Sequence, residues 1–109
     1  RINASEMQKV DTVKVKSTNI DFCHHTNNKE YVRFILNTYS VNTLKQTPIK
    51  SIQIEYQNQS FENDELDIYK STKQTDTIES SNDTSKPNFI DTISIMHNET
   101  PIIKCQIVR

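Results

Sequence analysis

The chain contains no glycine in 109 residues. Glycine allows positive φ angles and close approach of the backbone to a ligand, and several nucleotide-binding and catalytic loops need both. The sequence therefore excludes the dinucleotide-binding turn, the P-loop, the nucleophile elbow of α/β-hydrolases and the EF-hand calcium loop. Turns that require positive φ must use Asn or Asp instead.

Long apolar runs and basic runs are also missing. No stretch of about 18 apolar residues occurs, so we expect no membrane span in this chain. The formal net charge is −1, and the absence of a basic run predicts that nucleic acid is not a partner. The length indicates a single domain over residues 1–109. The first residue is Arg1, which indicates a processed chain or a domain taken from a longer protein.

Two cysteines and four sequons suggest an oxidising compartment. Cys23 and Cys105 lie near opposite ends of the chain and predict a disulfide, although two unrelated buried thiols are the alternative. Four sites fit the N-x-[ST] pattern for glycosylation: Asn3, Asn58, Asn82 and Asn98. Together these features predict an extracellular protein, secreted or exposed on a cell or virion surface.

Alternation of apolar and polar residues is the main structural signal. It predicts half-buried strands at 12–16, 50–56, 92–96 and 103–107. The last two strands form a hairpin in which Asn98 takes positive φ. Cys105 then lies on the final strand, with its side chain on the same face as Ile103 and Ile107. We place Cys23 at the end of an earlier strand.

Residues 30–41 fit two different structures. Tyr31, Phe34 and Ile35 would share one face of a helix, whereas alternate apolar residues fit a strand. Because Tyr, Val, Phe, Ile and Thr favour strands, we predict a long strand here. The polar stretch 71–88 predicts a long loop, with a short edge strand around 75–79.

These elements predict an all-β fold, an antiparallel β-sandwich that is Ig-like in general architecture. The alternative is an α+β fold, in which one helix over 29–44 packs on a four-stranded antiparallel sheet. No Trp lies between the cysteines, so the sequence lacks a hallmark of true immunoglobulin domains.

The three histidines lie in two places, at Cys23-His24-His25 and at His97. Thiolate and imidazole groups are ligands for transition metals, and a Cys–His pair can also act as a nucleophile. Adjacent side chains on a strand point to opposite faces, so only Cys23 and His25 can share a site. Because a disulfide would remove the thiolate, we predict no metal, no cofactor and no catalytic residue.

An acidic cluster lies within residues 61–70. Its members are Glu62, Asp64, Glu65 and Asp67. Calcium binding is disfavoured because the glycine turn and the ligand spacing of a calcium loop are both absent. The cluster is either a solvated edge of the sheet or a surface that attracts a basic protein partner.

The predicted function is a non-enzymatic recognition module that binds a protein partner, for example a viral, parasite or microbial factor that binds a host protein. One alternative is a structural β-subunit of the pilus or coat type, which assembles with copies of itself. Another is a small metal-binding protein or enzyme that uses Cys23, His25 or His97.

Overall fold

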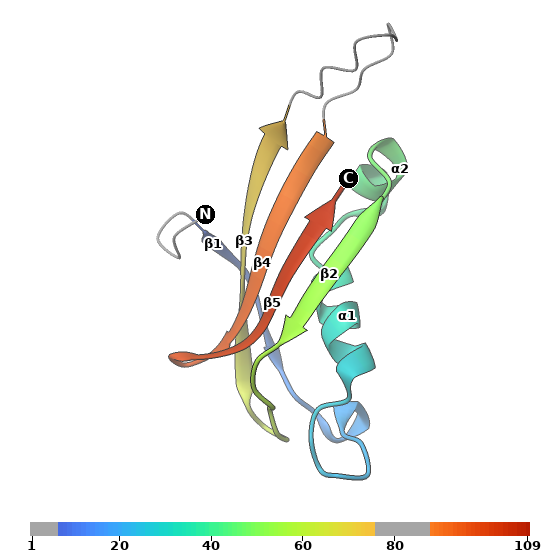
Figure 1. Cartoon of the computed structure of the whole chain (residues 1–109). Coiled ribbons are helices and arrows are strands. Elements are labelled where there is room, and N and C mark those ends of the chain that lie inside the picture. Colours follow the sequence, from blue (N-terminus) through green and yellow to red (C-terminus); the bar gives the residue numbers. More distant parts are fainter. Residues whose placement is uncertain (1–6, 76–87) are drawn as a thin grey trace, which may run out of the picture.

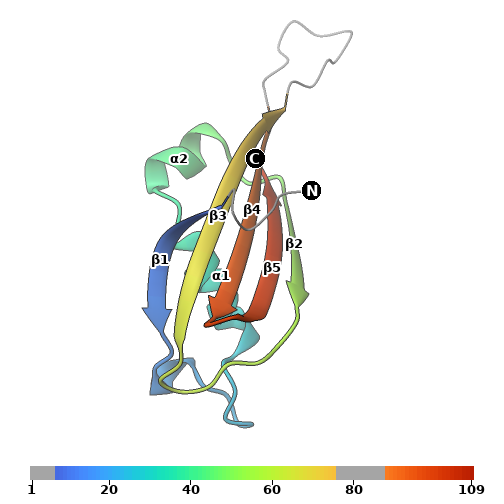
Figure 2. The ribbon, with the colours of Figure 1, turned by 90° about the vertical axis from the view of Figure 1, so that its left-hand side faces the viewer.

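The computed structural model describes residues 7–75 and 88–109, and Figure 1 shows their arrangement. The elements in chain order are β1 (Gln8–Lys14), η2 (Ser17–Asn19), α1 (Asn28–Leu36), α2 (Val41–Gln46), β2 (Ser51–Tyr56), β3 (Glu65–Thr75), β4 (Asn88–His97) and β5 (Thr100–Val108). Within these residues the strands form one antiparallel sheet in the order β1-β3-β4-β5-β2. Helix α1 lies against one face of this curved sheet (Figures 1 and 2).

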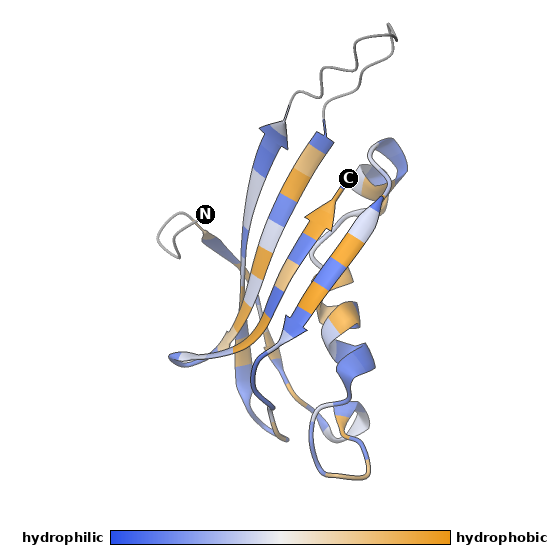
Figure 3. Ribbon diagram, viewed as in Figure 1, coloured by the Kyte–Doolittle hydropathy of each residue, from blue (hydrophilic) through white to orange (hydrophobic). Residues whose placement is uncertain are grey.

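The predicted β-sandwich is wrong, because a helix takes the place of the second sheet. Residues that alternate along the strands bury one face against α1, and Figure 3 shows this alternation along β2 and β5. Ile93 and Ile95 of β4 are fully buried, as are Ile103 and Ile107 of β5. Alternation reports only that one face of a strand is buried and does not say what covers it.

Helix α1 replaces the long strand predicted for 30–41. The side chain of Asn27 caps the helix by accepting a hydrogen bond from the Lys29 amide at 3.0 Å. Tyr31, Phe34 and Ile35 recur at helical spacing and are buried against the sheet. Burial of each such side chain contributes about 1.5–3 kcal/mol, which outweighs the strand propensity of these residue types.

The chain turns into a second, shorter helix immediately afterwards. Ser40 caps α2 by accepting a hydrogen bond from the Thr43 amide at 3.0 Å. The α+β alternative is therefore closer to the structure than the sandwich. It differs in having one helix over 29–44 where two are found, and four strands where the sheet has five.

The predicted hairpin between the last two strands is confirmed. Strands β4 and β5 are paired, and Asn98 in their connection has a φ of 55°. Ile103, Cys105 and Ile107 share the buried face of β5, as predicted. The strand at 50–56 is confirmed as β2, and the strand predicted at 12–16 begins earlier, at Gln8.

The remaining predictions concern β3 and membrane spans. Strand β3 extends to Thr75, into the segment predicted to be a polar loop, and the edge strand predicted around 75–79 lies mostly outside the described residues. Among the residues that the structure describes, no helix is long and apolar enough to cross a membrane.

Candidate active site

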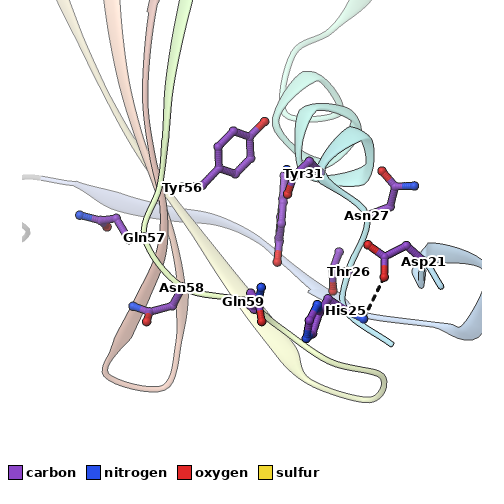
Figure 4. A pocket seen from close by; sticks show the side chains of 10 residues that line it. Asp21, His25, Thr26, Asn27, Tyr31, Tyr56, Gln57, Asn58 and Gln59 are labelled. Atoms are coloured by element: carbon purple, nitrogen blue, oxygen red, sulfur yellow. Dashed lines mark hydrogen bonds between the residues drawn. The ribbon is translucent and has the colours of Figure 1, made fainter. Parts of the chain in front are cut away.

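A pocket of about 430 Å³ lies beside the start of α1, and Figure 4 shows the side chains that line it. Its walls come from the loop before α1, from the first turns of α1 and from the segment that leaves β2. The lining residues are Asp21, His25, Thr26, Asn27, Asn28, Tyr31, Tyr56, Gln57, Asn58 and Gln59. Pockets of roughly 300–1,000 Å³ with a few convergent polar groups are typical of small-molecule sites.

The loop before α1 is folded around the carboxylate of Asp21. Its Oδ1 accepts hydrogen bonds from the amides of Cys23 at 2.9 Å and His25 at 3.2 Å. The Asp21 amide donates to the carbonyl of His25 at 2.9 Å, which closes the loop. His24 takes a left-handed φ of 66°, so the chain reverses at this residue. These bonds fix the backbone of the loop, and both Asp21 and His25 line the pocket.

Three buried hydroxyl groups join this loop to the segment after β2. The Oγ atom of Ser60 lies 2.7 Å from Thr26 Oγ1 and 2.6 Å from the hydroxyl of Tyr31. The Thr26 amide also donates to the Ser60 carbonyl at 2.8 Å. All three side chains are buried. This network fixes the distance between the two walls of the pocket.

Carboxamide side chains supply most of the other polar groups of the pocket. Asn27 caps α1, and Asn58 donates through Nδ2 to the Pro101 carbonyl at 2.7 Å. In Figure 4 the side chain of Gln57 points away from the loop, whereas that of Gln59 lies on the side facing His25. This leaves Asn28 and Gln59 as the lining carboxamides available to donate to a bound ligand.

The structure does not contain the predicted Cys23–Cys105 disulfide. Both cysteines are free thiols, with Cys23 exposed in the loop before α1 and Cys105 buried in the core. Cys23 also does not end a strand, because residues 21–24 form a turn. Burial raises the pKa of the Cys105 thiol to about 11, so this group is neutral at physiological pH.

The predicted glycosylation sites fall in different regions. Asn58 and Asn98 are exposed, but the side chain of Asn58 is already bonded to the Pro101 carbonyl. Asn3 and Asn82 lie outside the described residues.

The acidic cluster is partly engaged in contacts within the domain. Asp64 accepts a hydrogen bond from the Phe61 amide at 2.9 Å and lies 3.6 Å from His97. Asp67 accepts from Thr12 at 2.9 Å. Glu62 and Glu65 are exposed, and binding of a basic protein partner there stays a prediction.

A second polar cluster lies inside the core, at the opposite end of α1. The carboxylate of Asp91 is fully buried and accepts hydrogen bonds from Arg109, Thr72 and Tyr39. Burial alone would raise the pKa of Asp91, but these hydrogen bonds outweigh it and lower the pKa below its usual value. Burial and the bond to Asp91 raise the pKa of Tyr39. The cluster is saturated with internal bonds, so its role is structural.

A comparison with protein-family models decides the family. Residues 2–106 match the model of the acyl-ACP thioesterase C-terminal domain. The chain belongs to this family. No curated protein is similar enough in sequence to count as a match.

Solved structures agree with this family in fold. The 12:0-ACP thioesterase from Umbellularia californica is 15% identical with a TM-score of 0.75, and the match covers 100% of this chain and 38% of that one. An acyl-ACP thioesterase from Bacteroides thetaiotaomicron is 19% identical with a TM-score of 0.68, covering 93% and 37%. A probable thioesterase from Bartonella henselae is 12% identical with a TM-score of 0.73, covering 94% and 87%. The chain thus spans less than two fifths of these two acyl-ACP thioesterases. Its fold is the hotdog fold of thioesterases.

Family membership corrects the predicted function. The family is one of enzymes, so the non-enzymatic recognition module and the self-assembling structural subunit are both wrong. Of the alternatives, only the enzyme agrees with the family. The match to the acyl-ACP thioesterase family also overturns the expectation of a secreted, glycosylated or virion-surface protein.

Several site residues were not predicted from the sequence. Cys23 and His25 were candidates but Asp21 was not, although it precedes them in a regular Asp-x-Cys-x-His spacing. That spacing was the available signal. Nothing in the sequence indicates that Ser60 and Gln59 meet this loop, because Ser60 lies 34 positions after Thr26 in the chain.

Proposed function

We propose that this domain carries a catalytic pocket of a thioesterase that hydrolyses the thioester of acyl-ACP. The observation that carries the proposal is the placement of Asp21 and His25 at the wall of the pocket, in a domain of the acyl-ACP thioesterase family. A histidine beside a carboxylate is the usual general base for hydrolysis near neutral pH.

The reaction needs a base, an acid and a donor for the developing oxyanion. His25 takes a proton from water as the water oxygen attacks the carbonyl carbon of the thioester. The carbon–sulfur bond then breaks, and the same imidazole returns the proton to the sulfur of the leaving thiol. The products are a free carboxylic acid and the thiol of the carrier. The carboxylate of Asp21 has an oxygen within 4.8 Å of an imidazole nitrogen of His25, so its negative charge favours the imidazolium that forms in between.

The oxyanion is stabilised by N–H groups that the fold holds in place. Asn28 opens α1, where the partial positive charge of the helix favours a negative oxygen. Its carboxamide and that of Gln59 can donate to the carbonyl oxygen as negative charge develops. The amides of Lys29 and Glu30 are already bonded to Asn27, so they are not available for this role.

The experiment measures hydrolysis of acyl-ACP by the purified protein. Replacement of a general base costs about 10²–10⁴-fold in rate, so we expect His25→Asn to lower kcat by this factor. The matched control is His24→Asn, because His24 is the exposed neighbour that does not line the pocket. Activity unchanged in His25→Asn would overturn the proposal.

A further inference from the structure

The loop at the pocket wall brings together three different metal-ligating side chains. Asp21, Cys23 and His25 each offer one ligand atom, and these atoms all lie within 4.8 Å of one another. Hydrolysis as proposed above uses Asp21 and His25, and it leaves the thiol of Cys23 without a role. Because Cys23 is free and exposed, its sulfur is accessible from solvent.

The backbone of the loop pre-organises these ligands. The amides of Cys23 and His25 donate hydrogen bonds to Asp21 Oδ1, and the Asp21 amide donates one to the His25 carbonyl. These three hydrogen bonds fix the turn before any ion arrives. His24, which has the left-handed φ, lies between Cys23 and His25 in the chain and is not part of the cluster. The carboxylate holds the loop through Oδ1, and its second oxygen can coordinate a cation.

The donor set selects the class of ion. Thiolate and imidazole are ligands for zinc and related transition metals, whereas magnesium and calcium prefer oxygen ligands alone. Zinc binds these groups at about 2.0–2.3 Å, so ligands of one ion lie within roughly 4 Å of one another. The side chain of Cys23 is exposed and can rotate to close the remaining gap.

We propose that Asp21, Cys23 and His25 form a binding site for a zinc-class divalent cation. Three protein ligands leave a fourth position for water, as in open zinc sites. Binding releases a proton, because sulfur coordinates as the thiolate. The ion coordinates Asp21 and His25, the two residues assigned to hydrolysis, so it inhibits the reaction. This last consequence rests on the proposed function, but binding itself does not.

The binding test uses untagged, chelator-treated full-length protein titrated with Co²⁺, followed by displacement with Zn²⁺. The readout is the near-ultraviolet charge-transfer absorption of a cobalt–thiolate bond, which does not depend on activity. We expect this band in the wild type and its loss in Cys23→Ser. We expect Co²⁺ to bind at least about tenfold more weakly to His25→Asn, by analogy with the cost of disturbing metal ligation.

Two controls make the assignment specific. His24→Asn should keep the band at full intensity, because His24 lies outside the cluster. Cys23→Ala should also lose the band, and alanine has no hydroxyl group that could still coordinate the ion. Absence of the band in the wild type would overturn the proposal, as would its persistence in both Cys23 variants, which would assign it to another thiol.

The inhibition is measured separately. Zn²⁺ should reduce acyl-ACP hydrolysis by the wild type but not by Cys23→Ser, provided that this variant keeps its activity in chelator. If the band forms and the wild-type enzyme is active but insensitive to Zn²⁺, the inhibitory role is wrong and the metal site stands. If the band forms and His25→Asn hydrolyses acyl-ACP normally, the proposed function is wrong and the metal site stands.

Discussion

Arg109 holds the buried carboxylate of Asp91 through two hydrogen bonds, 2.7 Å from Nε to Oδ2 and 3.1 Å from Nη2 to Oδ1. This bidentate geometry is the strongest form of an arginine–carboxylate pair. The third guanidinium nitrogen, Nη1, donates to Thr47 Oγ1 at 2.6 Å. The pair therefore ties β4 and the residue after β5 to the residue that ends α2.

Loss of the charge on Asp91 should destabilise the fold strongly. Asp91→Asn leaves the guanidinium of Arg109 without its counter-charge inside the protein, and breaking such a buried pair costs about 3–5 kcal/mol. The control is Asp67→Asn, whose partner Lys9 is exposed and 3.8 Å away. This surface pair contributes about 0–1 kcal/mol. Urea unfolding of the two variants measures the contrast, and equal losses would contradict the structural role of Asp91.

The same carboxylate should make stability sensitive to acid. The pKa of Asp91 is lower in the folded protein than its unfolded value of about 3.9. Its contribution is therefore fully present above about pH 4, and it is lost as the pH falls through the lower folded pKa. The difference in unfolding free energy between wild type and Asp91→Asn should narrow on acidification in that range. If the difference in unfolding free energy between the two proteins stays constant as the pH falls below about 4, Asp91 does not make stability depend on pH.

The two thiols should differ sharply in reactivity. Cys23 is exposed, whereas Cys105 is buried and its pKa is raised to about 11. A thiol reagent should therefore modify one cysteine in the native protein and the second only after unfolding, because the thiolate is the reactive form. Intact mass should not change on reduction. A gain of about two daltons on reduction would instead show that the predicted disulfide forms.

The hydroxyl network under the pocket should contribute to stability and to activity. Ser60→Ala removes the partner of Thr26 and of the Tyr31 hydroxyl, and stranding a buried polar group costs about 1–3 kcal/mol. We also expect slower acyl-ACP hydrolysis, because the network positions the loop that carries His25. Ser51→Ala, at an exposed site on β2, is the control and should change neither quantity.

The hairpin turn should prefer residues that tolerate positive φ. Asn98 has a φ of 55°, a conformation that disfavours β-branched side chains. Asn98→Val should lower the melting temperature, whereas Asn98→Gly should be neutral or nearly so, because glycine adopts this conformation without steric cost. Thermal unfolding compares the two, and a stable Asn98→Val would show that the turn relaxes into another geometry.

Local patterns in the sequence were enough for the strands near the end of the chain. Alternation placed β2 and the β4–β5 hairpin, and the absence of glycine pointed to Asn98 as the residue with positive φ. These features depend on neighbours within a few residues, so the sequence carries their signal directly. The same reasoning failed at 30–41, where strand propensity and a helical apolar face conflict within one segment.

The tertiary structure decided the helix, the number of sheets and the site. Tyr31, Phe34 and Ile35 become a helical face only because a sheet is present for them to cover. The pocket joins Asp21 and His25 to Gln59, which no local pattern connects to them. Composition excluded glycine-dependent catalytic loops, but a site built from one capped helix and one tight loop needs no glycine. Its existence depends on contacts between segments distant in sequence, and only the folded chain brings those together.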